Sequence, residues 1–143
     1  MRLKVDISKL DFVIRYFESV RNDLAAVESV SNTFTTQQKN FFTKRCIAGA
    51  RLDADAEGIQ CPICIEMGIK GLAYDDRKRR CEACPVSSAC WPTQDSAYNR
   101  IMAALKNDDP KKARHAVSGA IADLKKIQAQ SFTGGSFSVE VDA

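Results

Sequence analysis

The stretch that decides the fold is SKLDFVIRYFESVRNDLAAVESV, residues 8–30. Its apolar side chains recur at steps of three and four residues, which places them on one face of a helix and leaves the other face polar. These side chains are Leu10, Val13, Ile14, Phe17, Val20, Leu24, Val27 and Val30. Ser8 and Asp11 have the S-x-x-D spacing of a helix cap. The sequence therefore predicts a long first helix over about residues 9–30, capped by Ser8.

A second amphipathic segment begins after a break at residues 31–33. Thr35 and Gln38 have the spacing of a capping box, in which each side chain bonds to the backbone N–H of the other residue. The short connection predicts that this helix runs antiparallel to the first and shares an apolar seam with it. Its apolar positions are Phe41, Phe42, Cys46, Ile47 and Ala50. Because Cys46 belongs to this register, we expect it to be a small buried hydrophobe and not a metal ligand.

Helical periodicity returns after residue 94 and predicts two more helices. The first is short, with its N-cap expected near Thr93 or Asp95. Asp109 followed by Pro110 is a start signal for the second, since proline at the first helical position gives up only an N–H that has no helical partner. The apolar positions of these two helices are Ala97, Ile101, Ala104 and Leu105, then Ala113, Val117, Ala120, Ile121, Leu124 and Ile127.

Length and composition fit one globular domain: 143 residues, 45% hydrophobic and 27% charged. A chain of this size buries roughly 68% of its unfolded surface, so its stability does not require a metal or disulfides. We predict an all-α domain over residues 1–143, with an N-terminal helical hairpin, two C-terminal helices and a zinc-stabilised, loop-rich insertion between them. The hairpin is predicted over residues 1–52, the insertion over 53–94, the C-terminal helices over 95–131 and a tail over 132–143. In the tail, Phe137, Val139 and Val141 alternate with other residues, which predicts either a strand that pairs elsewhere or a mobile end.

The chain carries no signal for secretion or membrane insertion. Residues 1–6 are not followed by the apolar core of a signal peptide, and no window approaches about 18 apolar residues. We therefore expect a cytoplasmic protein with reduced thiols, in which cysteine pairs more often bind metal than form disulfides. The net charge of +3 is too small to indicate a nucleic-acid binder by itself.

Five of the six cysteines cluster in the predicted insertion. Cys61 and Cys64 form one C-x2-C pair, and Cys81 and Cys84 form a second. Two such pairs separated by about 15 to 20 residues complete a tetrahedral Zn²⁺ site. Cys61 and Cys64 are the firmest pair of ligands, whereas Cys81, Cys84 and Cys90 compete for the other two positions.

Two other interpretations of these thiols stay open. An iron–sulfur cluster also binds four cysteine thiolates, and Cys84 followed by Pro85 fits such a site. Redox thiols or disulfides are the other alternative, although no βαβ pattern of the thioredoxin kind is visible. Zinc is favoured by the spacing and by the absence of a histidine near the cysteines. An iron–sulfur protein would be brown, whereas zinc is colourless.

The cysteine run resembles a group of small cysteine-cluster proteins encoded by phages and prophages. The resemblance rests on Cys61-Pro-Ile-Cys64, on Cys81-Glu-Ala-Cys84-Pro85-Val86, and on Cys90 with Pro92 soon after it, followed by a helical C-terminal part. It covers about residues 58–130. It implies a phage or prophage origin and a metal knuckle, and it implies no catalytic activity.

The only concentrated charge run directly precedes Cys81: Arg77, Lys78, Arg79 and Arg80. Four cations on a metal-fixed knuckle are able to lie along a phosphate backbone. They would also offset the negative charge of four zinc-bound thiolates, and Asp75 and Asp76 halve the local excess. Basic residues on the last helix extend the run or form an ordinary solvated face: Lys111, Lys112, Arg114, Lys125 and Lys126.

Few other residues indicate chemistry. His115 is the sole histidine and is expected at the surface, which argues against a Ser–His–Asp or Cys–His site. The carboxylates of residues 53–57 are expected in a polar linker. Trp91 and Tyr98 are expected to pack the insertion onto the helices.

These observations predict a non-enzymatic, zinc-binding interaction protein, of phage type, that binds a host or phage protein in the host cytoplasm. The alternative is a nucleic-acid-binding zinc knuckle that uses residues 77–80. A thiol- or carboxylate-dependent enzyme is the third hypothesis. A homodimer is a further option, because long amphipathic helices often have apolar surface to share.

Overall fold

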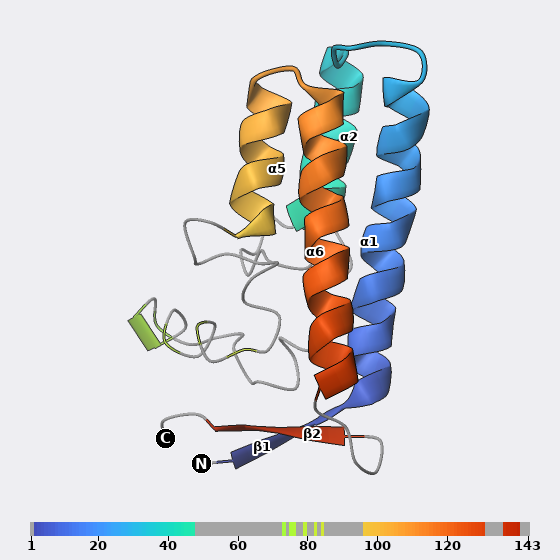
Figure 1. Ribbon diagram of the computed structural model, residues 1–143. Coiled ribbons are helices and arrows are strands. Elements are labelled where there is room, and N and C mark those ends of the chain that lie inside the picture. Colours follow the sequence, from blue (N-terminus) through green and yellow to red (C-terminus); the bar gives the residue numbers. More distant parts are fainter. Residues whose placement is uncertain are drawn as a thin grey trace.

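The computed structural model describes residues 2–47, 96–130 and 136–140, and between them Ala73, Asp75, Asp76, Arg79, Glu82 and Cys84. Its elements are, in chain order, β1 (Arg2–Asp6), α1 (Ile7–Glu28), α2 (Thr36–Ile47), α5 (Ala97–Lys106), α6 (Pro110–Gln130) and β2 (Ser136–Glu140). The four helices lie side by side, and the two strands cross one end of the bundle (Figure 1). The helical character predicted from the sequence is confirmed for the described helices. The predicted insertion lies mostly outside the described residues.

The core forms where α1 and α5 pack against α6. The expected apolar stripes supply most of it: Leu10, Val13, Ile14, Phe17, Val20, Leu24, Phe42, Ala97, Ile101, Ala104, Leu105, Ala113, Val117, Ala120, Ile121 and Leu124 are all buried. Val27 and Ile127 are partly buried against this cluster. Val30 was expected on the same stripe but is 81% exposed, because α1 ends at Glu28 and Val30 lies in the turn beyond it.

The first helix begins earlier than predicted, and Ser8 is not its cap. Asp6 is the N-cap, and its Oδ1 accepts a hydrogen bond of 2.9 Å from the backbone N–H of Ser8. This bond lowers the pKa of the Asp6 carboxyl. Both residue types cap helices well, and the chain uses the one that ends β1 and directly precedes α1.

The second helix starts as predicted. The Thr35 N–H donates to Gln38 Oε1 at 2.8 Å, and the Gln38 N–H donates to Thr35 Oγ1 at 3.1 Å, which is a complete capping box. The α1–α2 hairpin is antiparallel, but α2 contacts α5 more extensively than it contacts α1. Phe42 is buried, whereas Phe41, expected beside it in the apolar register, is 48% exposed. The side chain of Cys46 lies outside the described residues, as does Ala50.

The N-caps of α5 and α6 lie near the positions expected from the sequence. The cap of α5 is Ser96, one residue beyond Asp95, and its Oγ accepts from the Asn99 N–H at 3.2 Å. At the start of α6, Asp109 Oδ1 accepts from the Lys112 N–H at 3.0 Å.

Asp108 lies in the turn between α5 and α6. It adopts a left-handed conformation with φ of 56°, which aspartate tolerates better than most residues. Its Oδ1 lies 2.5 Å from Lys39 Nζ, and this ion pair ties the turn to α2.

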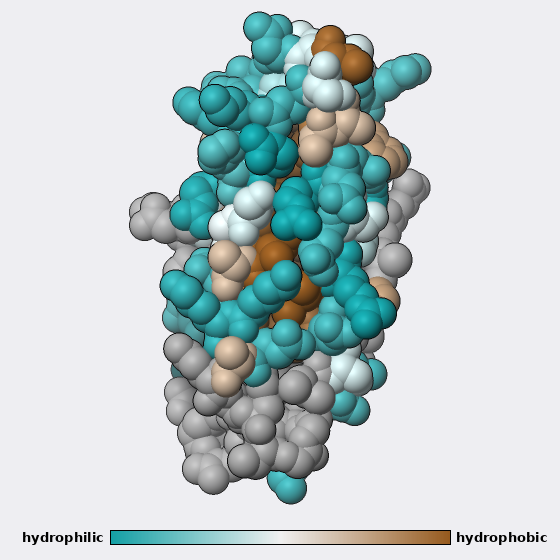
Figure 2. Space-filling view, turned by 45° about the vertical axis from the view of Figure 1, so that its right-hand side comes forward, coloured by the Kyte–Doolittle hydropathy of each residue, from teal (hydrophilic) through white to brown (hydrophobic). Residues whose placement is uncertain are grey.

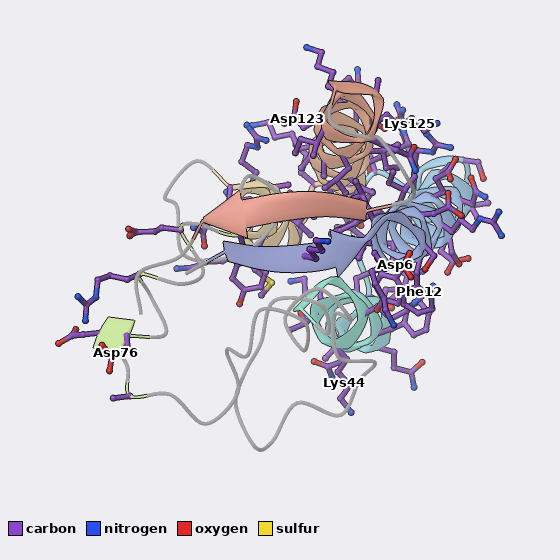
Figure 3. All side chains as sticks on the ribbon, turned by 90° about the horizontal axis from the view of Figure 1, so that it is seen from below. Asp6, Phe12, Lys44, Asp76, Asp123 and Lys125 are labelled. Atoms are coloured by element: carbon purple, nitrogen blue, oxygen red, sulfur yellow. The ribbon has the colours of Figure 1, made fainter. Side chains whose placement is uncertain are left out.

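The tail forms the strand that its alternation indicates. β2 pairs antiparallel with β1, in a register that runs from Arg2 opposite Glu140 to Asp6 opposite Ser136. Figure 3 shows the two strands lying across the ends of the helices. The partner strand β1 was not predicted, although its alternating Leu3 and Val5 carry the same signal as the tail. None of the described helices has the length and apolar character that a membrane crossing requires.

The buried face of α6 provides a test of the core. Leu124 is fully buried, so we expect Leu124→Ala to lower the free energy of unfolding by about 2 to 5 kcal/mol. The exposed Val30→Ala is the matched control and should change it by less than about 0.5 kcal/mol. Urea unfolding followed by circular dichroism measures both. Equal effects of the two substitutions would contradict the described packing of α6.

Candidate functional site

A groove of about 710 Å³ lies between α5 and α6, beside the turn that joins them. Its lining includes four small residues, which we call the floor residues: Ala103, Ala104, Ala116 and Gly119. Small side chains leave space where two helices would otherwise interdigitate. At Gly119 even an added Cβ would meet no atom within 4 Å. The groove is therefore a result of residue size on two facing helices.

The rim of this groove is basic. Arg100 on α5 and Lys111, Lys112 and His115 on α6 line it, and all four are exposed. Within the described part of the chain, none of these four side chains forms an ion pair. Asn107 and Asp109 line the groove at the turn, where the Asp109 carboxylate already accepts the Lys112 N–H. We name Arg100, Lys111, Lys112 and His115 the basic rim.

Three members of the basic rim are recognisable from the sequence, but the groove that they line is not. Lys111, Lys112 and His115 were singled out as a basic helix face and a surface histidine, but Arg100 and the small floor residues were not named. The available signal was weak: alanine and glycine at interior helix positions also occur in ordinary tight packing. Only the tertiary arrangement shows that the space above them is empty.

Arg114 does not belong to the basic rim, because it forms an ion pair with Glu28 at the end of α1. Its Nε donates to Glu28 Oε2, and its Nη2 donates to Oε1 at 3.2 Å, so the pair is bidentate. The hydrogen bond from Arg114 lowers the pKa of the Glu28 carboxyl, with smaller contributions from the charges of His115 and Lys111. The same bond raises the pKa of Arg114.

The other basic residues predicted on α6 lie away from the groove. Lys125 and Lys126 are exposed and are not part of the lining. Lys125 Nζ is 3.8 Å from Glu18 of α1, and Figure 3 shows Lys125 and Asp123 on opposite sides of α6. The two ends of α6 therefore present their cations to different surroundings.

Of the five clustered cysteines, only Cys84 is within the described residues. It is 6% exposed and belongs to the buried hydrophobic cluster. Cys61, Cys64, Cys81 and Cys90 lie outside the described residues. Among the residues that the structure does describe, no group of three potential metal ligands comes together. The predicted zinc ligands thus stay a prediction from their spacing.

Of the basic run, only Arg79 is described. Its side chain is 67% exposed and forms an ion pair with Asp76, one helical turn earlier. This pairing agrees with the expectation that the neighbouring acidic residues reduce the local positive charge. Arg77, Lys78 and Arg80 lie outside the described residues.

His115 lies at the surface of α6, as expected. Tyr98 is half-buried and packs against the core, but the insertion that it was expected to hold lies mostly outside the described residues. Trp91 and the carboxylates of residues 53–57 lie outside the described residues.

Comparison with known protein families, with curated proteins and with solved structures finds no match for this chain.

The Glu28–Arg114 pair predicts a pH dependence of stability. Because the pKa of Glu28 is lower in the folded than in the unfolded chain, the pair stabilises the fold fully above about pH 4.5 and loses this effect as pH falls through the lowered value. We expect Glu28→Gln to lower Tm at neutral pH, and the difference from the unmodified chain to shrink in acid. Thermal melts from pH 3 to pH 7, in steps of about one unit, measure this.

Arg114→Ala and the double variant provide the control. If the two residues act as a pair, the double variant should lose about as much as either single variant at neutral pH. A Tm difference for Glu28→Gln that is the same at every pH would contradict the assignment.

Proposed function

We propose that this chain is a non-enzymatic, zinc-binding interaction protein that binds another protein in the cytoplasm, of the kind that phages use to modulate a host or phage protein. The observation that carries the proposal is the spacing of Cys61, Cys64, Cys81 and Cys84. Four thiolates fill the tetrahedral coordination of Zn²⁺ and leave no position for water or substrate, so such a metal has a structural role. Function then depends on the protein surface.

The buried position of Cys84 supports this role for the cysteine segment. Cys84 is 6% exposed and part of the hydrophobic cluster, so the cysteine segment contacts the folded body at this residue. A metal bound by the adjacent thiolates would then have a firm attachment. Cys84 serves equally as a ligand or as a packing residue in this arrangement, with Cys90 supplying the fourth thiolate in the second case.

The described surface also fits binding better than catalysis. Among the described residues, the groove is lined by the cations of the basic rim and by one carboxylate, that of Asp109, which already caps α6. Catalysis by a nucleophile or a general base needs a second group within hydrogen-bond reach, and His115 has no such described partner. A surface with cations and accessible small residues is suited to holding a partner.

A second copy of the chain is the other protein partner we consider. Phe12 on α1 and Phe41 on α2 are 44% and 48% exposed. Aromatic side chains that stay half-exposed in a monomer are frequent anchors of interfaces. Sedimentation at several protein concentrations separates a homodimer from a monomer that binds a different protein.

Zinc content tests the proposal. The chain, purified under reducing conditions, should contain about one Zn²⁺ per molecule by elemental analysis. Cys61→Ser combined with Cys64→Ser should remove it, because both residues are expected ligands. The matched control is Cys46→Ser, which should retain the metal. A brown protein with stoichiometric iron would show that the cysteines bind an iron–sulfur cluster and not zinc. A chain that contains neither metal would refute the proposal.

Nucleic-acid binding is the second candidate function, and the exposure of Arg79 favours it. Lysine and arginine side chains at the surface bind phosphates with an affinity that falls steeply as salt rises. If this function is right, the chain should retard DNA or RNA in a gel at low salt, and alanine at Arg77, Lys78, Arg79 and Arg80 together should abolish the retardation. The control for net charge compares the alanine double variant of Arg79 and Arg80 with that of Lys125 and Lys126, since each removes two cations. Absence of retardation by the unmodified chain at low salt refutes this candidate.

A further inference from the structure

We propose that the groove between α5 and α6 is the docking site for an acidic peptide segment of a partner protein. The inference deepens the proposed function and rests on it, since it names the surface and the chemistry of the partner for an interaction protein. Its starting observation is the juxtaposition of an open groove of about 710 Å³ with Arg100, Lys111 and Lys112, none of which forms an ion pair in the described part of the chain.

Charge complementarity identifies the occupant as anionic. Among the described lining residues, the three cations outnumber the one carboxylate, that of Asp109, which already accepts a hydrogen bond from the Lys112 N–H. Other acidic groups nearby are also engaged: Glu28 pairs with Arg114, and Asp108 pairs with Lys39. The basic rim therefore keeps its charge available for a ligand from outside.

The shape of the groove indicates a segment of a larger molecule and not a small metabolite. Small ligands bind in cavities that cover roughly 70 to 90% of their surface. Here the rim residues and Ala103 are exposed, so the groove is open along one side. A peptide covers such an open groove while the rest of its protein stays outside. The small floor residues allow a backbone or a helix to approach α5 and α6 closely.

The arrangement of the rim also sets the spacing of the acidic groups. Arg100 lies seven residues before Asn107, which is the C-cap of α5 at the turn end of the groove, so about 10 Å separate the two residues along the helix axis. Lys111 and Lys112 lie at the turn end, at the start of α6. The favoured peptide thus has two acidic side chains about 10 Å apart, which is two turns of a helix or about three residues of extended chain.

A nucleic acid fits the groove less well. Single strands are bound by aromatic side chains that stack on the bases as well as by cations. None of the lining residues that the structure describes is aromatic, and the Asp109 carboxylate at the end of the groove would repel a continuous run of phosphates. The chemistry of the lining therefore favours carboxylates separated by uncharged residues.

The test uses the full chain and a displayed library of random peptides of about 12 residues, a length that spans three helical turns. Peptides selected by the chain should be enriched in aspartate and glutamate, with two acids at the spacing given above. A synthetic copy of the most enriched peptide is then titrated against variants by fluorescence polarisation at low and at physiological salt. A version with glutamine and asparagine in place of the acids should bind at least about tenfold more weakly.

Two pairs of variants connect binding to the groove. Arg100→Ala with Lys112→Ala should weaken binding about fivefold or more, whereas Lys125→Ala with Lys126→Ala removes the same charge from the other end of α6 and should not. Ala103→Trp should fill the groove from an exposed position and weaken binding at least about tenfold, whereas Ala122→Trp, exposed on α6 outside the groove, should leave it unchanged. Helix content and Tm of each variant confirm that it folds.

Each other outcome overturns the proposal. Failure to select any peptide, selection of peptides without acids, or equal effects of groove and control variants would each refute the groove as the docking site. Groove-dependent binding of a single-stranded DNA or RNA oligonucleotide in place of peptides would assign the groove to nucleic acid. The Cys61→Ser, Cys64→Ser double variant distinguishes failure of the docking proposal from failure of the proposed function. Loss of zinc from that variant concerns the cysteine site alone, whereas loss of peptide binding in the groove variants concerns the groove alone.

Discussion

The structure depends on the packing of α1 against α6. These are the two longest helices, and each buries one apolar stripe along much of its length against the other. Burial of these aliphatic and aromatic side chains supplies the main stabilisation, at roughly 25 cal/mol for each Å² of apolar surface removed from water. The shorter helices then add to this pair: α5 packs on α6, and α2 packs mainly on α5. The outer surface is correspondingly polar, and Figure 2 shows one face that is mostly hydrophilic with a narrow hydrophobic strip.

The same helix, α6, connects the core to the candidate site. One of its faces carries Val117, Ile121 and Leu124 into the core, while an adjacent face carries Lys112 and His115 to the groove. The turn before α6 fixes the direction of both faces, because Asp109 caps the helix and Asp108 is tied to Lys39 on α2. The position of the basic rim therefore follows from the packing of the core.

The sequence predicted the parts of this fold that depend on local pattern. The four buried residues of α5 and the capping box at Thr35 were predicted correctly, because helical periodicity and cap spacing involve residues only a few positions apart. Neighbouring Ser and Asp residues compete as caps, which explains the error at Ser8 and the position of the α5 cap at Ser96, one residue beyond Asp95. Strand β1 was missed because five residues with short alternation become a strand only when β2, from the other end of the chain, pairs with them.

The candidate site was less accessible to sequence reasoning. Lys111, Lys112 and His115 stood out by residue type, but Arg100 joins them only through the packing of α5 on α6. The hollow itself depends on which alanines face open space, and Ala103 and Ala113 look alike in the sequence although one is exposed and the other is buried. By contrast, the cysteine pattern is a strong signal in the sequence itself, since its spacing indicates a set of metal ligands before any tertiary contact is known.

The separation of α1 and α6 along the chain has a consequence for biosynthesis. When the ribosome has produced α1 and α2, the main partner of α1 does not yet exist, so its apolar stripe stays accessible until α6 has emerged. Contacts between such distant segments close large loops and form late in folding. At a synthesis rate of about 5 to 20 residues per second, the stripe would be accessible for several seconds on each nascent chain. Chaperones that recognise exposed apolar helices would have their best opportunity to bind during this interval.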